Sequence, residues 1–77
     1  MTAPRLSPAR ARVLAAAADG SPLSVVASRL ETTREQVAAR LSEAYRQLDV
    51  AWMPREERRA AAVLLAREHG LIPEERP

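Results

Sequence analysis

The chain has 77 residues, which is enough for one domain and too few for two. It contains no cysteine and only one histidine, His69, so disulfides, thiolate metal sites and catalytic or metal-binding histidine pairs are excluded. All 12 basic residues are arginines, and with 10 acidic residues the formal net charge is only +2, which is modest for a nucleic-acid binder.

The first predicted helix begins at Pro8 and ends near Asp19-Gly20. Ser7 is a favourable N-cap, proline suits the first helical position, and glycine suits the position just after a helix. The apolar stripe that this helix would turn toward the core consists of Val13, Leu14, Ala17 and Ala18.

A second, short helix is expected after Ser21-Pro22, which repeats the serine-proline pattern and makes Ser21 the predicted N-cap. The residues that it would bury are Val25 or Val26, Ala27 and Leu30. Only Glu31-Thr32-Thr33 separates this helix from the next one, which is the short turn expected between the two helices of a helix-turn-helix unit.

The third helix has the clearest pattern and runs from Arg34 to Leu48. Thr33 and Gln36 match a capping box at its start. Apolar residues at helical spacing form its inward face: Val37, Leu41, Ala44, Tyr45 and Leu48. The opposite face carries Glu35, Ala39, Ser42, Glu43 and Arg46.

The fourth helix is predicted over residues 54–70. Pro54 starts it, Glu56 and Glu57 suit its first turn, and Gly70 ends it. Leu71-Ile72-Pro73 would form an apolar lid, and residues 73–77 a frayed charged tail.

Two bulky residues, Trp52 and Met53, precede the fourth helix and have two interpretations. They would either cover the seam where this helix folds back on the domain or anchor a partner protein. We expect the first arrangement.

The predicted elements together make one all-α, four-helix domain over residues 1–77. Residues 6–50 would form a helix-turn-helix core, whose second helix usually enters the DNA major groove. Residues 1–46 hold seven arginines against four acids, and residues 47–77 hold five against six, so the first part is the better candidate for a polyanion-facing surface.

The residues expected to contact DNA lie on the third helix and directly around its start: Arg29, Thr33, Arg34, Glu35, Ala38, Ala39, Arg40, Ser42 and Arg46. The arginines would supply charge, while the small side chains would lie closest to the base edges. The alternative is a solvated face in which Glu43 pairs with Arg40 or Arg46, each three residues away on the helix.

An ordered series of residues resembles the LuxR/FixJ-type (GerE-like) helix-turn-helix DNA-binding domain in free-standing form. The series comprises Leu6-Ser7-Pro8, Val13-Leu14, Asp19-Gly20, Val26-Ala27, Leu30, Val37, Leu41-Ser42, Tyr45-Arg46, Leu48 and the stretch 59–72. The resemblance implies a transcription regulator whose last helix forms a homodimer. The chain departs from the family pattern at Ala38, where lysine is common, and at Arg40, where histidine is usual.

The fourth helix is apolar on more than one side, which independently favours a homodimer. The residues assigned to the dimer interface are Ala61, Ala62, Leu64 and Leu65, which cannot all face one small core. A fully internal helix is the competing explanation.

The functional expectation is therefore a small DNA-binding transcriptional regulator that acts on double-stranded DNA as a homodimer. The alternative is a protein-interaction module on the same scaffold that binds RNA polymerase, a sigma factor or another regulator. A third, weaker alternative is similarity to the promoter-reading domain of sigma factors.

We expect no enzymatic activity, because the carboxylates of the chain do not form a convergent acid/base pair, and we expect no cofactor. No apolar run approaches the roughly 20 residues that span a bilayer, and the first five residues lack the apolar stretch of a secretory signal. The expected location is cytoplasmic, on the nucleoid when the protein binds DNA.

Overall fold

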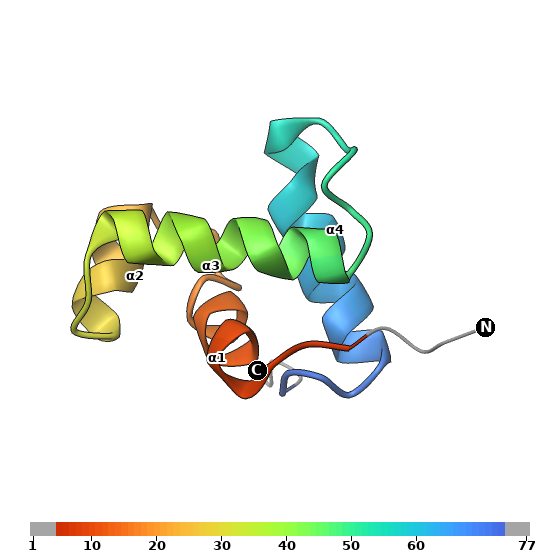
Figure 1. The fold of residues 1–77 in the computed structure, drawn as a ribbon, viewed down its shortest axis with the longest axis horizontal. Coiled ribbons are helices and arrows are strands. Elements are labelled where there is room, and N and C mark those ends of the chain that lie inside the picture. The colour runs from red at the N-terminus through yellow and green to blue at the C-terminus, as the bar shows by residue number, and fades with distance from the viewer. Residues whose placement is uncertain (1–4, 74–77) are drawn as a thin grey trace.

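A computed structural model describes residues 5–73 of the chain, and this part contains four helices and no strand. The helices are α1 (Pro8–Ala16), α2 (Leu23–Arg29), α3 (Arg34–Gln47) and α4 (Arg55–Glu68) (Figure 1). The all-α class predicted from the sequence is confirmed. None of these four helices combines the length and the apolar character that crossing a bilayer requires.

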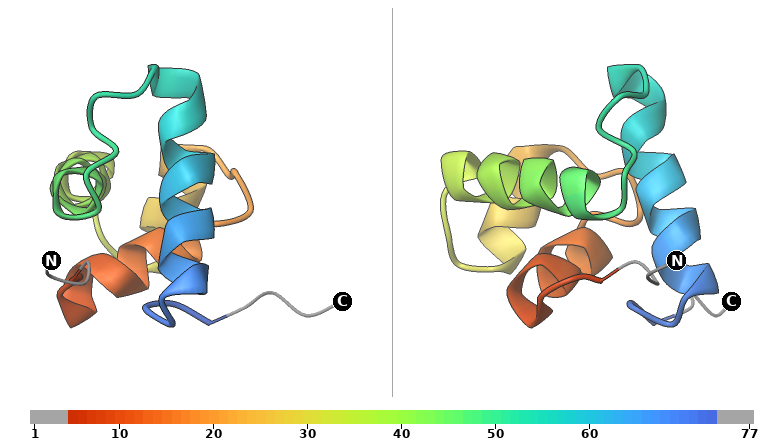
Figure 2. Two further views of the ribbon diagram at one scale, coloured as in Figure 1. Left: turned by 90° about the vertical axis from the view of Figure 1, so that its right-hand side faces the viewer. Right: turned by 45° about the vertical axis from the view of Figure 1, so that its right-hand side comes forward.

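The helices are arranged around α3. In Figure 1, α2 lies at the N-terminal end of α3, α1 lies below it, and α4 crosses behind its C-terminal end. The first turns of α4 project beyond α3, whereas its last turns lie closer to α1. Viewed along α3, this helix stands at one edge of the molecule, with α1 below it and α4 beside it (Figure 2).

Local signals set the starts of α1 and α3 as predicted. The Ser7 hydroxyl accepts a hydrogen bond from the Arg10 backbone N–H at 3.3 Å, and the Thr33 hydroxyl accepts one from Gln36 N–H at 3.2 Å. The predicted cap at Ser21 is wrong, because α2 begins after Pro22 with no side-chain cap. Ser21 is instead part of the preceding turn, where its N–H donates to the Asp19 carboxylate at 3.0 Å.

Left-handed residues directly follow the C-caps of α2, α3 and α4. Gly70, with a φ value of 67°, comes after the C-cap His69, which confirms it as the residue that ends the fourth helix. The prediction that Gly20 ends the first helix is wrong, because α1 ends at Ala16 with Ala17 as its C-cap, and Gly20, with a φ value of 81°, ends the turn that follows. Glu31 and Asp49 adopt the same region after α2 and α3, with φ values of 53° and 57°, although side chains disfavour it. After α3 this turn lets the Val50 N–H donate to the Tyr45 carbonyl at 2.9 Å, which satisfies a helix-end acceptor.

One apolar core joins all four helices, and no polar side chain within residues 5–73 is buried in it. Five of its fourteen buried residues are alanines. The predicted inward positions are confirmed for Val13, Leu14, Ala17, Val26, Ala27, Val37, Leu41, Ala44 and Leu48. Ala18, Leu30 and Tyr45 are half-buried against the core.

The residues after α4 partly match the prediction of an apolar lid. Ile72 is buried in the core and Leu71 packs against it, whereas Pro73 is exposed. The rest of the predicted frayed tail, residues 74–77, lies outside the described residues.

Two features of α4 and the segment before it differ from expectation. Ala62 is fully buried in the core, so it cannot belong to an exposed dimer surface and that assignment is wrong. Ala61 and Leu65 are half-buried, and Leu64 is 61% exposed. Met53 packs against the core, but Trp52 is 76% exposed and does not cover the seam.

Candidate nucleic-acid interface

The outer face of α3 is an open helical surface. Glu35, Ala39, Ser42 and Arg46 are exposed along it, and Ala38 and Arg40 flank it half-buried. Thr33 and Arg34 are exposed at its N-terminal end. Glu35, Ala39, Ser42 and Arg46 share one face because inward-facing apolar residues fix the rotation of α3 against the core, and Ala38 and Arg40 lie on opposite edges of that face. The helix and its N-cap carry all the predicted contact residues except Arg29, which lies on α2.

Three arginines of α3 keep their charge available. Within residues 5–73, Arg34, Arg40 and Arg46 have no ion-pair or hydrogen-bond partner for their guanidinium groups. Of the two carboxylates of α3, Glu35 is exposed, whereas Glu43 is half-buried and paired with Arg10. The open surface therefore carries more positive than negative charge.

Glu43 does not pair with either predicted neighbour on α3. Its carboxylate accepts a hydrogen bond from the Arg10 Nε of α1 at 2.7 Å and also forms an ion pair with the Arg10 Nη2. The predicted pairing with Arg40 or Arg46 is wrong, because Arg10 reaches Glu43 from the helix packed below α3. As a result, Arg10 is compensated while Arg40 and Arg46 are not.

Arg29 is held by the turn between α1 and α2. Its Nη1 donates to the Ala16 carbonyl at 3.1 Å and forms an ion pair with Asp19 at 3.0 Å. Hydrogen bonds from Ser21 and then the pairing with Arg29 lower the pKa of Asp19 to about 2. Asp19 is therefore charged at neutral pH, and Arg29 contributes little net charge to this side of the molecule.

A groove between α3 and α4 contains basic residues that sequence analysis missed. It has a volume of about 430 Å³ and is lined by Leu23, Ala38, Leu41, Ser42, Tyr45, Arg55, Arg58 and Arg59. A smaller hollow of about 190 Å³ shares Ser42, Tyr45 and Arg58 with it and adds Arg46 and Ala51. We call the two together the arginine groove. Four arginines and no carboxylate line it.

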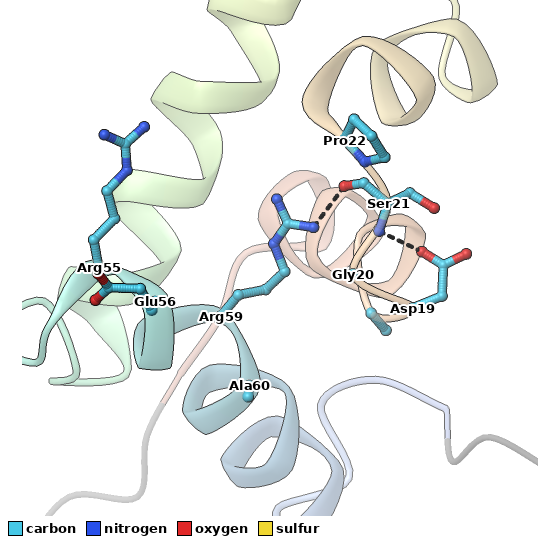
Figure 3. Close-up of a pocket in the computed structure, with 9 residues that line it drawn as sticks. Asp19, Gly20, Ser21, Pro22, Arg55, Glu56, Arg59 and Ala60 are labelled. Carbon is cyan, nitrogen blue, oxygen red and sulfur yellow. Dashed lines mark hydrogen bonds between the residues drawn. The ribbon is translucent and has the colours of Figure 1, made fainter.

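The arginines of α4 in this groove have different roles. Arg58 donates from Nε and Nη2 to the Met53 carbonyl at 3.2 and 2.9 Å. Arg59 donates to the Ser21 carbonyl at 2.6 Å and points into the α1–α2 turn (Figure 3). Arg55 points away from that turn, is exposed, and has no partner in the described part of the chain.

A signal for this arginine cluster is present in the sequence but is lost when charges are summed over residues 47–77. Arg55, Arg58 and Arg59 are spaced three and four residues apart, which places them on one side of a helix. Glu56 and Glu57 between them cancel their charge in any sum over residues 47–77. Only the packing of α4 beside α3 places the arginines, without the glutamates, in the groove lining.

A pocket on the other side of Arg59 is lined by both acidic and basic residues. It has a volume of about 620 Å³ and is lined mainly by the α1–α2 turn and the start of α4 (Figure 3). Asp19 and Glu56 face the same pocket as Arg55 and Arg59. The opposed charges make it a poor site for a polyanion.

Trp52 forms an exposed and fixed feature beside these sites. Its indole Nε1 donates to the Asp49 carbonyl at 2.9 Å, at the end of α3. The hydrogen bond holds the ring although 76% of the residue is exposed.

Comparisons of the chain with protein-family models, with curated proteins and with solved structures gave no significant match.

Proposed function

We propose that this protein is a DNA-binding transcriptional regulator of the helix-turn-helix type, in which α3 enters the major groove. The observation that carries the proposal is the outer face of α3, where Arg34, Arg40 and Arg46 lack partners among the described residues. The short turn between α2 and α3 and the ordered resemblance to LuxR/FixJ-type domains support it.

The dimensions and side chains of α3 suit this role. Its 14 residues span about 21 Å, and a helix with its side chains is about as wide as the major groove of B-DNA. Ala39 and Ser42 are small enough to let the helix approach the bases closely. Arg46 can donate to a phosphate or to a guanine edge, and Ser42 can bond either.

We further propose that the regulator acts as a homodimer through α4, on two DNA half-sites related by the dimer axis. Leu64, which is 61% exposed, would lie at the centre of the contact, with Ala61 and Leu65 beside it. Ala62 has no part in this interface because it is buried in the monomer. A cytoplasmic protein bound to the nucleoid follows from the same proposal.

A titration of a labelled mixed-sequence DNA duplex tests the proposal. Fluorescence anisotropy is measured at about 50 and about 200 mM salt, because phosphate contacts make binding weaken steeply as salt rises. We expect binding at the lower salt that weakens at the higher. An anisotropy that stays unchanged at the lower salt, up to the solubility limit of the protein, would contradict it.

A protein-interaction module on the same scaffold is the second candidate, and the exposure of Trp52 favours it. Exposed tryptophans are typical anchors of protein interfaces, and this one is already fixed by its bond to Asp49. Partners of the expected kind are RNA polymerase, a sigma factor or another regulator. Absence of DNA binding at low salt, together with capture of one of these purified partners that Trp52→Ala abolishes, would favour this function.

A further inference from the structure

We infer that the arginine groove binds the phosphate backbone of one strand of the DNA duplex, alongside α3. This inference rests on the proposed function and adds a second contact surface to it, contributed by α4. The groove combines Ser42, Tyr45 and Arg46 of α3 with Arg55, Arg58 and Arg59 of α4. The sequence-predicted contact surface included none of the three α4 arginines.

The distribution of compensated charge favours this side of α3. On the α1 and α2 side, Arg10 is paired with Glu43 and Arg29 with Asp19. On the α4 side, the groove lining holds four guanidinium groups and no carboxylate. A phosphate strand therefore meets a lining without carboxylates beside α4, whereas two of the three arginines of α1 and α2 are already paired and only Arg12 is not.

The width of the major groove places the phosphate strands of DNA beside both flanks of a helix docked in it. A helix with its side chains is about 10–12 Å across and the major groove about 12 Å wide, so a docked α3 has phosphate strands directly on both flanks. On one flank α4 lies beside α3 (Figure 2), and the residues of these two helices line the arginine groove there. A strand passing there would meet the side chains that line it.

The segment between α3 and α4 holds the groove in shape. It carries the start of α4 past α3, so that the first turns of α4 project on one side (Figure 1). The Met53 carbonyl accepts two hydrogen bonds from Arg58, and the Asp49 carbonyl accepts one from Trp52. The site is therefore built before a ligand arrives, which reduces the ordering cost of binding.

The chemistry of the lining matches a phosphate diester. Guanidinium groups bind phosphate oxygens with two parallel hydrogen bonds, and serine and tyrosine hydroxyls donate to the same oxygens. Arg55 is the side chain best placed to move onto a phosphate, because it is exposed and has no partner within residues 5–73. Arg58 and Arg59 are already bonded to backbone carbonyls and add fixed charge.

The test replaces Arg55 and measures the salt dependence of duplex binding by anisotropy. For Arg55→Ala we expect the negative slope of log K against log salt, where K is the association constant, to become less steep by about 0.9, the value for one lost phosphate contact. K at about 50 mM salt should fall several-fold. Arg55→Lys keeps the charge and should retain most of the slope. Arg12→Ala is the matched control, because Arg12 is an exposed arginine of α1 without a partner in the described chain.

The outcomes separate this inference from the proposed function. Wild-type binding with an unchanged slope for Arg55→Ala would overturn the inference and leave the role of α3 intact. Equal losses in Arg55→Ala and Arg12→Ala would also overturn it, since they would indicate a general effect of net charge. Failure of the wild-type protein to bind duplex DNA would overturn both proposals.

Discussion

The strongest prediction for the outer face of α3 concerns the double variant Arg40→Ala/Arg46→Ala. Both arginines lack partners among residues 5–73, so their removal breaks no ion pair or hydrogen bond described there. If each neutralises one phosphate, the slope of log K against log salt falls by about 1.8 in magnitude. Because salt rises fourfold between about 50 and 200 mM, the ratio of the wild-type to the variant association constant should decrease about 12-fold over that range.

The assay is the anisotropy titration of a mixed-sequence duplex at several salt concentrations, with circular dichroism to verify that the variant is folded. The double variant Arg5→Ala/Arg12→Ala removes the same charge from exposed positions outside α3 and serves as control. It should change the slope much less. A wild-type slope in the α3 variant, or the same reduction in both double variants, would refute the assignment of α3 as the contact surface.

Three further predictions concern the core, the α1–α2 turn and α4. Leu14→Ala leaves a cavity at a fully buried position and should destabilise the fold by about 3 kcal/mol. In a thermal scan this lowers the melting temperature by about 12–24 °C. A decrease below about 5 °C would show that the core is not packed as described. Asp19 has a lowered pKa of about 2, so its stabilising effect is complete above about pH 4 and disappears as the pH falls toward 2. Urea unfolding should therefore show a wild-type advantage over Asp19→Asn that is constant above pH 4 and shrinks below it, and an advantage that grows on acidification would contradict the pairing. If the proposed homodimer forms, Leu64→Glu, which changes an exposed residue, should convert it to monomers in sedimentation and leave the melting temperature of the fold nearly unchanged. A wild-type protein that sediments as a monomer would contradict the proposed dimer, and a variant that stays dimeric would exclude Leu64 from the contact.

The elements that sequence analysis predicted well depend on local signals. Ser7 and Thr33 cap the helices that follow them, and Gly70 ends α4, because each acts through backbone groups within three residues. The inward face of α3 was also predictable, since a core on one side of a helix imposes helical spacing on apolar residues.

The features that could not be predicted depend on partners distant in sequence. Glu43 had plausible partners on its own helix, but the packing of α1 against α3 supplies Arg10, which is 33 residues away. Serine is a typical N-cap residue, yet Ser21 is part of the turn before α2. Its N–H donates to the Asp19 carboxylate, and its carbonyl accepts from Arg59. The arginine groove depends on the direction in which α4 leaves the segment after α3, and no local pattern encodes that direction.

The buried alanines of α4 have a consequence for the charged surface. Ala62 and Ala66 are fully buried against the core, so we expect a larger side chain at either position to displace α4 outward. That helix carries Arg55, and its displacement would move the guanidinium away from Ser42 without altering any surface residue. The small size of two buried alanine side chains thus determines the distance between the two helices that line an external groove.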